Sequence, residues 1–94
     1  MDSSKLRIEK FDGSDFSFWK MQIEDCLYQK NLHEPLTGVK LESMMEEKWK
    51  LKDRQARGLI RLTLSRNVAF NIVKEKTTFG MLKALSNMYE KHRR

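Results

Sequence analysis

Apolar residues recur with helical spacing through most of this sequence. Between positions 16 and 31, four of them fall at i, i+4, i+7 and i+8: Trp19, Ile23, Cys26 and Leu27. This spacing is typical of the packed face of an amphipathic helix. It predicts a helix that is capped by Ser14 or Asp15, whose side chains can accept the first free N–H groups, and that runs to about Asn31.

Phe18, Met21 and Tyr28 lie on roughly the opposite side of this predicted helix. Two interpretations are open. The helix is either central in the bundle and buried on both sides, or it exposes a stripe that awaits a partner. In the second case the three residues are candidates for self-association.

A second long helix is predicted from about Ser43 to about Leu64. Five of its residues share one face: Trp49, Asp53, Ala56, Ile60 and Leu64. Asp53 therefore falls within an apolar stripe, where a carboxylate must be paired or hydrogen-bonded. We expect it to form a cap or salt bridge that joins two helices, with an assembly contact as the alternative. Gly58 lies off this face and costs about 1 kcal/mol of helix propensity relative to Ala, which suggests a close approach by another helix.

Two further helices follow. Ser65 is predicted to cap a short one, and Thr77 or Thr78 to cap the last. The short helix carries Val68, Ala69, Ile72 and Val73. The last helix is expected to direct Phe79, Leu82, Leu85 and Tyr89 inward.

The two ends of the chain differ from this helical pattern. Residues 5–11 alternate apolar with charged side chains, which predicts a short extended segment. Asp12-Gly13 is a turn signal, because glycine adopts a positive φ without strain. Residues 91–94 place cations after the last helix, where the helix dipole favours them. We therefore predict an all-α fold, a small orthogonal bundle of four or five helices with a short extended N-terminal arm. The arm and turn occupy residues 1–13, the helical lobe residues 14–90, and the basic tail residues 91–94.

Charge divides the 94-residue chain into two unlike halves. Residues 1–47 carry 6 Lys and Arg against 10 Asp and Glu, whereas residues 48–94 carry 13 against 3. Such asymmetry fits contact with a polyanion, head-to-tail attraction between copies of the chain, or a solvated surface with no partner.

Part of the positive charge forms a stripe at i, i+4, i+7 and i+11 of the second helix: Lys50, Arg54, Arg57 and Arg61. Phosphates contact such stripes through charge. No aromatic residue interleaves with these cations to stack on bases, so any RNA contact is expected to be weak and non-specific. A solvated face, or attraction to the acidic first helix of a neighbour, are the other interpretations.

The residues that catalysis or cofactor binding would need are scarce in this sequence. One Cys and two distant His cannot supply the four ligands of a zinc knuckle, and the four glycines are too scattered for a phosphate loop. No His has an evident partner for nucleophilic catalysis. We therefore expect no enzymatic activity, no metal, no cofactor and no small-molecule substrate. No apolar run is long enough to cross a membrane, no secretory signal begins the chain, and the single Cys26 suits a reducing compartment, so we expect no membrane contact and a cytoplasmic location.

Three blocks of the sequence together resemble the N-terminal capsid-like region of copia-type LTR retrotransposon Gag polyproteins. The first block is Phe11-Asp12-Gly13 followed by Phe16-Ser17-Phe18-Trp19-Lys20. The second is Trp-x3-Asp-x2-Ala-x3-Ile-x3-Leu-Ser, from Trp49 to Ser65. The third starts at Thr77-Thr78 and ends in Leu85-x3-Tyr89-Glu90. The signature positions, with the helix-1 leucine, are Phe11, Gly13, Trp19, Leu27, Trp49, Asp53, Ala56, Ile60, Leu64, Leu85 and Tyr89.

The resemblance implies an assembly protein and not an enzyme. Its helical lobe would polymerise with copies of itself or with related Gag chains into a particle that encloses RNA. In relatives the chain continues into a second helical lobe, whereas this sequence stops at Lys91-His92-Arg93-Arg94. We therefore expect a fragment, or a truncated or co-opted copy that interferes with the assembly of related elements. A free-standing basic helical module that binds RNA non-specifically is the alternative.

Overall fold

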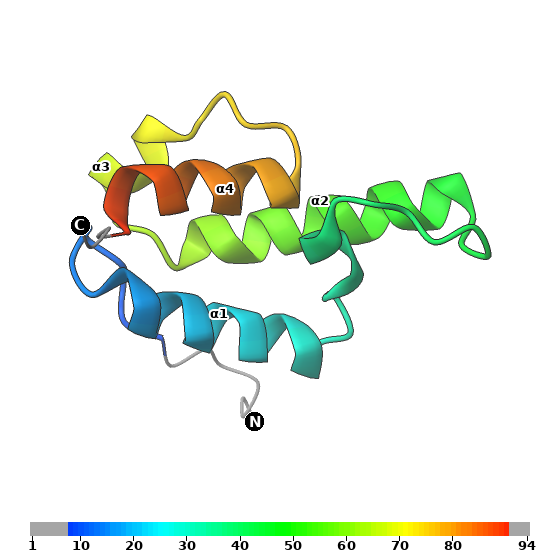
Figure 1. Cartoon of the computed structure of the whole chain (residues 1–94), viewed down its shortest axis with the longest axis horizontal. Coiled ribbons are helices and arrows are strands. Elements are labelled where there is room, and N and C mark those ends of the chain that lie inside the picture. The colour runs from blue at the N-terminus through cyan, green and yellow to red at the C-terminus, as the bar shows by residue number, and fades with distance from the viewer. Residues whose placement is uncertain (1–7, 91–94) are drawn as a thin grey trace.

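Two long helices and two shorter ones form the fold, which is known from a computed structural model that describes residues 8–90. The helices are α1 (Phe16–Gln29), α2 (Glu46–Leu62), α3 (Arg66–Asn71) and α4 (Thr78–Tyr89), and a 3-10 turn, η1 (Glu34–Thr37), joins α1 to the loop before α2. The predicted all-α fold is thus confirmed. In Figure 1, α4 lies along α2, while α1 runs on the other side of α2.

One apolar core joins the helices. From α1 it takes Trp19, Ile23 and Leu27 of the predicted stripe and also Phe16, whereas Cys26 is only partly buried. Helix α2 adds Ala56 and Ile60. From the last helix, Met81, Leu82 and Leu85 are buried. Leu27, Ala56, Ile60 and Leu85 are completely inaccessible to solvent. Truncation of one of the larger side chains would leave a cavity, and a larger side chain at Ala56 would overpack the core.

The N-terminal arm meets the end of α2. Phe11 donates its N–H to the carbonyl of Thr63 (2.8 Å) and accepts from the N–H of Ser65 (2.9 Å). These bonds form an isolated parallel bridge between Phe11 and Leu64. The predicted extended segment is therefore present at Phe11. Residues 5–7 of that segment and the basic tail at 91–94 lie outside the described residues.

Helix ends were predicted well where the capping group is local. The Ser65 hydroxyl accepts the N–H of Val68, and the Thr77 hydroxyl accepts that of Gly80, so both predicted caps are confirmed. The helix α1 ends at Gln29, two residues before the predicted end. Asn31 is left-handed there (φ 62°), and the N–H of Leu32 returns to the carbonyl of Leu27 (2.7 Å), which is a Schellman ending.

The predicted starts of both long helices need correction. Asp15 precedes α1 but is left-handed (φ 57°) and makes no capping bond. The Ser14 hydroxyl and amide instead donate to the carboxylate of Asp12. Helix α2 begins at Glu46 and not near Ser43, because the N–H of Met44 closes a turn onto the carbonyl of Leu41. Glu46 and Glu47 then place negative charge in the first turn, where the helix dipole favours it.

Two predicted inward side chains are not in the core. Phe79 is 45% exposed, and its ring covers Gly38, where an added Cβ would lie 2.8 Å from the Phe79 Cγ. Met81 takes its place in the core. Trp49 is only half-buried, since the N-terminal part of α2 extends past α1 and α4 (Figure 1).

Candidate functional site

An aromatic corner brings the first and third sequence blocks together. The Phe11 ring stacks on Trp19 (centroids 5.0 Å apart) and meets the edge of Tyr89 (5.3 Å). Trp19 Nε1 donates to the buried Thr63 hydroxyl (3.0 Å). Gly13 turns the chain at φ 109°, and an added Cβ there would lie 3.2 Å from the Tyr89 ring. Four signature positions thus fix the arm against the helices.

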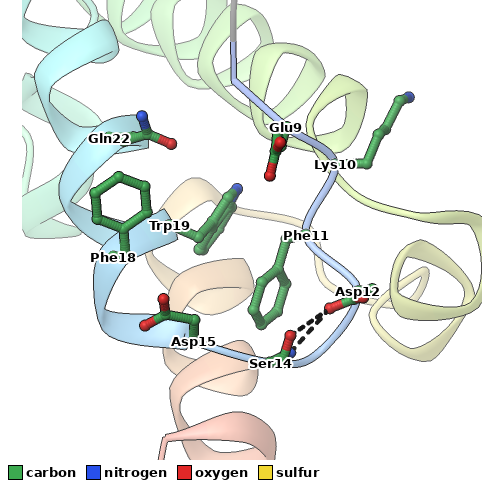
Figure 2. A pocket seen from close by; sticks show the side chains of 9 residues that line it. All are labelled: Glu9, Lys10, Phe11, Asp12, Ser14, Asp15, Phe18, Trp19 and Gln22. Carbon is green, nitrogen blue, oxygen red and sulfur yellow. Dashed lines mark hydrogen bonds between the residues drawn. The ribbon is translucent and has the colours of Figure 1, made fainter.

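A polar hollow opens between the arm and the start of α1. Figure 2 shows Glu9 and Lys10 on the arm side, with Phe18, Trp19 and Gln22 on the helix side. Asp12 and Asp15 add two further carboxylates. The hydrogen bonds from the Ser14 hydroxyl and amide hold the pKa of Asp12 below its ordinary value. The hollow therefore carries negative charge beside an aromatic ring, and no imidazole is among the residues that line it.

Asp53 connects α2 to the start of α4. Its Oδ1 accepts the N–H of Thr78 (2.9 Å), and its backbone carbonyl accepts the Thr78 hydroxyl (3.1 Å). Its Oδ2 pairs with Arg57 Nε (3.2 Å). The carboxylate is therefore both a helix cap and half of an ion pair. The predicted structural role of Asp53 is confirmed by these contacts.

The outer face of α1 is a stripe of exposed apolar side chains. Phe18, Met21 and Tyr28 are 52%, 50% and 61% exposed. The interpretation that α1 is buried on both sides is therefore wrong, because this face is largely exposed while only the opposite face, with Phe16, Trp19, Ile23 and Leu27, is buried. Tyr28 also stacks flat on the His33 ring, with centroids 4.3 Å apart. We call Phe18, Met21, Asp25 and Tyr28 the α1 stripe, since Asp25 is exposed on the same face.

The predicted basic stripe of α2 is divided by the structure. Lys50 and Arg54 are exposed, Arg61 is half-buried, and Arg57 is bound to Asp53. Arg57 therefore pairs with the same carboxylate that joins α2 to α4. The cations that still face outward are Lys50, Arg54 and Arg61.

Sequence reasoning missed a shallow, open groove beside these cations. It lies between the end of α1 and the outer side of α2, and its surface is mainly apolar. Its lining includes Lys30, Leu32, Arg54, Gly58, Arg61 and Leu62. The one signal in the sequence was Gly58, which the structure places in the groove. We call these six residues the α2 groove.

Metal-binding side chains do not cluster in the described part of the chain, and its cysteine is half-buried. Residues 8–90 hold no group of three or more His, Cys, Asp or Glu side chains that could bind a metal ion. Burial raises the pKa of the Cys26 thiol, which sits half-buried against the core. None of the helices in this part is long and apolar enough to span a membrane.

Comparison with known proteins adds an independent observation. The chain is 36% identical over 92 residues to the retrovirus-related Pol polyprotein from transposon TNT 1-94 of Nicotiana tabacum. The sequence is therefore similar to a short part of a retrotransposon polyprotein. The match covers 95% of this chain but only 7% of the polyprotein, so this chain corresponds to a small segment of that protein. No protein-family profile and no solved structure matches the chain.

Proposed function

We propose that the chain is a structural module of a copia-type Gag polyprotein that acts by self-association and not by catalysis. In this proposal it forms a capsid-like N-terminal lobe of a virus-like particle, assembled in the cytoplasm from copies of itself or related Gag chains. The observation that carries the proposal is the exposed α1 stripe. The similarity to a transposon polyprotein supports the same kind of role.

Exposure of the α1 stripe is costly unless something covers it. Its three large apolar side chains project from one face of a single helix, and each is at least half exposed. Burying one such side chain yields about 1.5–3 kcal/mol. Large exposed apolar patches mark interaction sites more often than isolated surface residues do. A partner surface on another chain would recover this free energy.

The proposal is tested by a matched pair of substitutions. Phe18→Ser removes an apolar ring from the α1 stripe, and Phe70→Ser removes one from α3, where Phe70 is 75% exposed. Sedimentation velocity should show weaker self-association for Phe18→Ser than for the natural chain. Phe70→Ser should associate as strongly as the natural chain. If both variants associate as strongly as the natural chain, the α1 stripe is not part of the assembly contact.

Non-specific RNA contact is a second candidate, favoured by the outward cations Lys50, Arg54 and Arg61. Each phosphate contact contributes a salt-dependent free energy, so affinity should fall steeply as salt rises. The double variant Lys50→Glu/Arg54→Glu should lose binding to a single-stranded RNA oligonucleotide in a filter or fluorescence assay. Arg57 is left unchanged, because reversing its charge would break the pair with Asp53. Equal RNA affinity of the double variant and the natural chain would exclude this candidate.

A further inference from the structure

We propose that the α1 stripe of one copy of this chain docks in the α2 groove of a second copy. This inference deepens the proposed self-association, on which it rests, by naming the two surfaces that meet. It makes the contact head-to-tail, because the two surfaces are different parts of the molecule.

Gly58 is the first observation that points to an external occupant. A glycine inside a helix costs about 1 kcal/mol relative to Ala, so a close approach usually explains it. Within the described part of the chain nothing makes that approach. An added Cβ would find only Arg54 Nη1, at 4.0 Å. The space over Gly58 is therefore open to another molecule.

The apolar character of the groove continues past Gly58. Leu62 lines it and is 67% exposed, and Leu32 contributes from the chain just after α1. A helix laid along the groove would cover Leu62 and contact the bare backbone at Gly58. Because glycine has no Cβ, it allows another molecule to approach the helix backbone closely.

Charge favours a partner helix that carries an acid near its centre. Lys30, Arg54 and Arg61 line the groove, and within residues 8–90 none of them forms an ion pair. On the α1 stripe, Phe18, Met21, Asp25 and Tyr28 follow the spacing i, i+3, i+7 and i+10, which is the seam of two packed helices. Asp25 thus stands between apolar neighbours and also lacks an ion pair in the described residues.

The lengths of the two surfaces agree. At 1.5 Å per residue, the α1 stripe from Phe18 to Tyr28 is about 15 Å long, and the groove from Arg54 to Leu62 is about 12 Å long. One helix-to-helix contact of this length is smaller than a standard interface of about 1,600 Å². A single contact is therefore weak, and repeated contacts in an assembly would strengthen it.

A charge swap tests the pairing directly. Asp25→Lys and Arg54→Glu each place like charges across the contact, so each should weaken the self-association constant by about tenfold or more. The double variant Asp25→Lys/Arg54→Glu restores opposite charges and should recover association to within about threefold of the natural chain. A mixture of the two single variants should also associate, because the introduced lysine of one chain faces the introduced glutamate of the other.

Two control variants carry the same charge changes away from the contact. Glu42→Lys alters the exposed loop before α2, and Arg66→Glu alters the exposed start of α3. Both should associate like the natural chain. Failure of the double variant and of the mixture to recover would overturn the pairing of these surfaces.

Gly58→Leu separates docking from fold stability. The leucine favours the helix, and its Cβ would have only Arg54 Nη1 within 4.0 Å, so the thermal midpoint should rise by about 4 °C. The same side chain fills the groove, so association should fall by about tenfold or more. Unchanged association of Gly58→Leu would show that the groove is empty in the assembly.

The outcomes distinguish this inference from the proposed function. If the natural chain associates and none of these variants changes its association constant, the docking is overturned and self-association is left intact. A natural chain that stays monomeric throughout would overturn both. Loss of RNA binding in Arg54→Glu and Gly58→Leu with no change in association would assign the groove to nucleic acid and contradict the docking.

Discussion

At the scale of single residues, Asp53 shows why a charge sits inside an apolar stripe. Its carboxylate is bound on both oxygens, to the N–H of Thr78 and to Arg57. The first N–H groups of a helix have no partner within that helix. Asp53 supplies one from a different helix, so it joins α2 to α4 while it caps α4.

We expect Asp53→Ala to lower the free energy of unfolding by about 2–3 kcal/mol, since it leaves a buried N–H unpaired and removes a cap. Asp53→Asn should cost less, because its amide oxygen can still accept the Thr78 N–H. Urea denaturation at low protein concentration measures both. If both variants are as stable as the natural chain, the contacts of Asp53 with Thr78 and Arg57 contribute nothing to the free energy of unfolding.

At the scale of elements, Glu34 and Lys52 hold η1 against α2. Lys52 Nζ lies 3.2 Å from Glu34 Oε1 and also donates to the carbonyl of Asn31 (2.8 Å). Partial burial raises the pKa of Glu34, but the hydrogen bond from its own backbone N–H and the neighbouring Lys52 outweigh it. The net result is a lowered pKa.

A lowered pKa in the folded chain fixes the direction of a pH effect. The contribution of Glu34 to stability is fully present above the unfolded value of 4.5, and it is lost as pH falls through the folded pKa. Glu34→Gln should therefore be less stable than the natural chain at pH 7. The difference should shrink as pH falls from 7 to below that unfolded value. Urea midpoints across this range measure it, and a constant difference would contradict the coupling.

Local signals explain which elements could be predicted from the sequence. The starts of α3 and α4 depend on the hydroxyls of Ser65 and Thr77, which act three residues away, and both were predicted. The left-handed Asp15 and the outward Phe79 were not. Phe79 packs over Gly38, which is distant in the sequence, and no local signal marks the left-handed backbone of Asp15. The spacing of the α1 stripe could be predicted from the sequence. Its exposure could not, because exposure depends on where the other helices pack.

The α2 groove could not be predicted from the sequence. Lys30 and Leu32 meet Arg54 and Leu62 only after the chain has reversed direction, so no sequence window contains both walls. Gly58 signalled a close approach, and the structure changed its interpretation. No described part of the chain itself makes that approach.

At the scale of the whole molecule, the uneven charge is distributed over separate surfaces. The acidic half supplies the hollow beside Phe18 and the Asp25 of the α1 stripe, whereas the outward cations of the basic half lie along α2. Opposite charges on separate surfaces attract copies in one orientation and repel like surfaces. Salt screens such attraction, with a Debye length that falls from about 10 Å at 0.1 M to about 3 Å at 1 M.

Sedimentation velocity of the natural chain over a concentration series tests self-association most directly. We expect the weight-average mass to rise above that of the monomer between about 10 μM and about 1 mM, the range of a contact smaller than a standard interface. The rise should diminish as salt increases from about 0.1 M to about 1 M. A monomer at every concentration and salt would contradict assembly through this lobe.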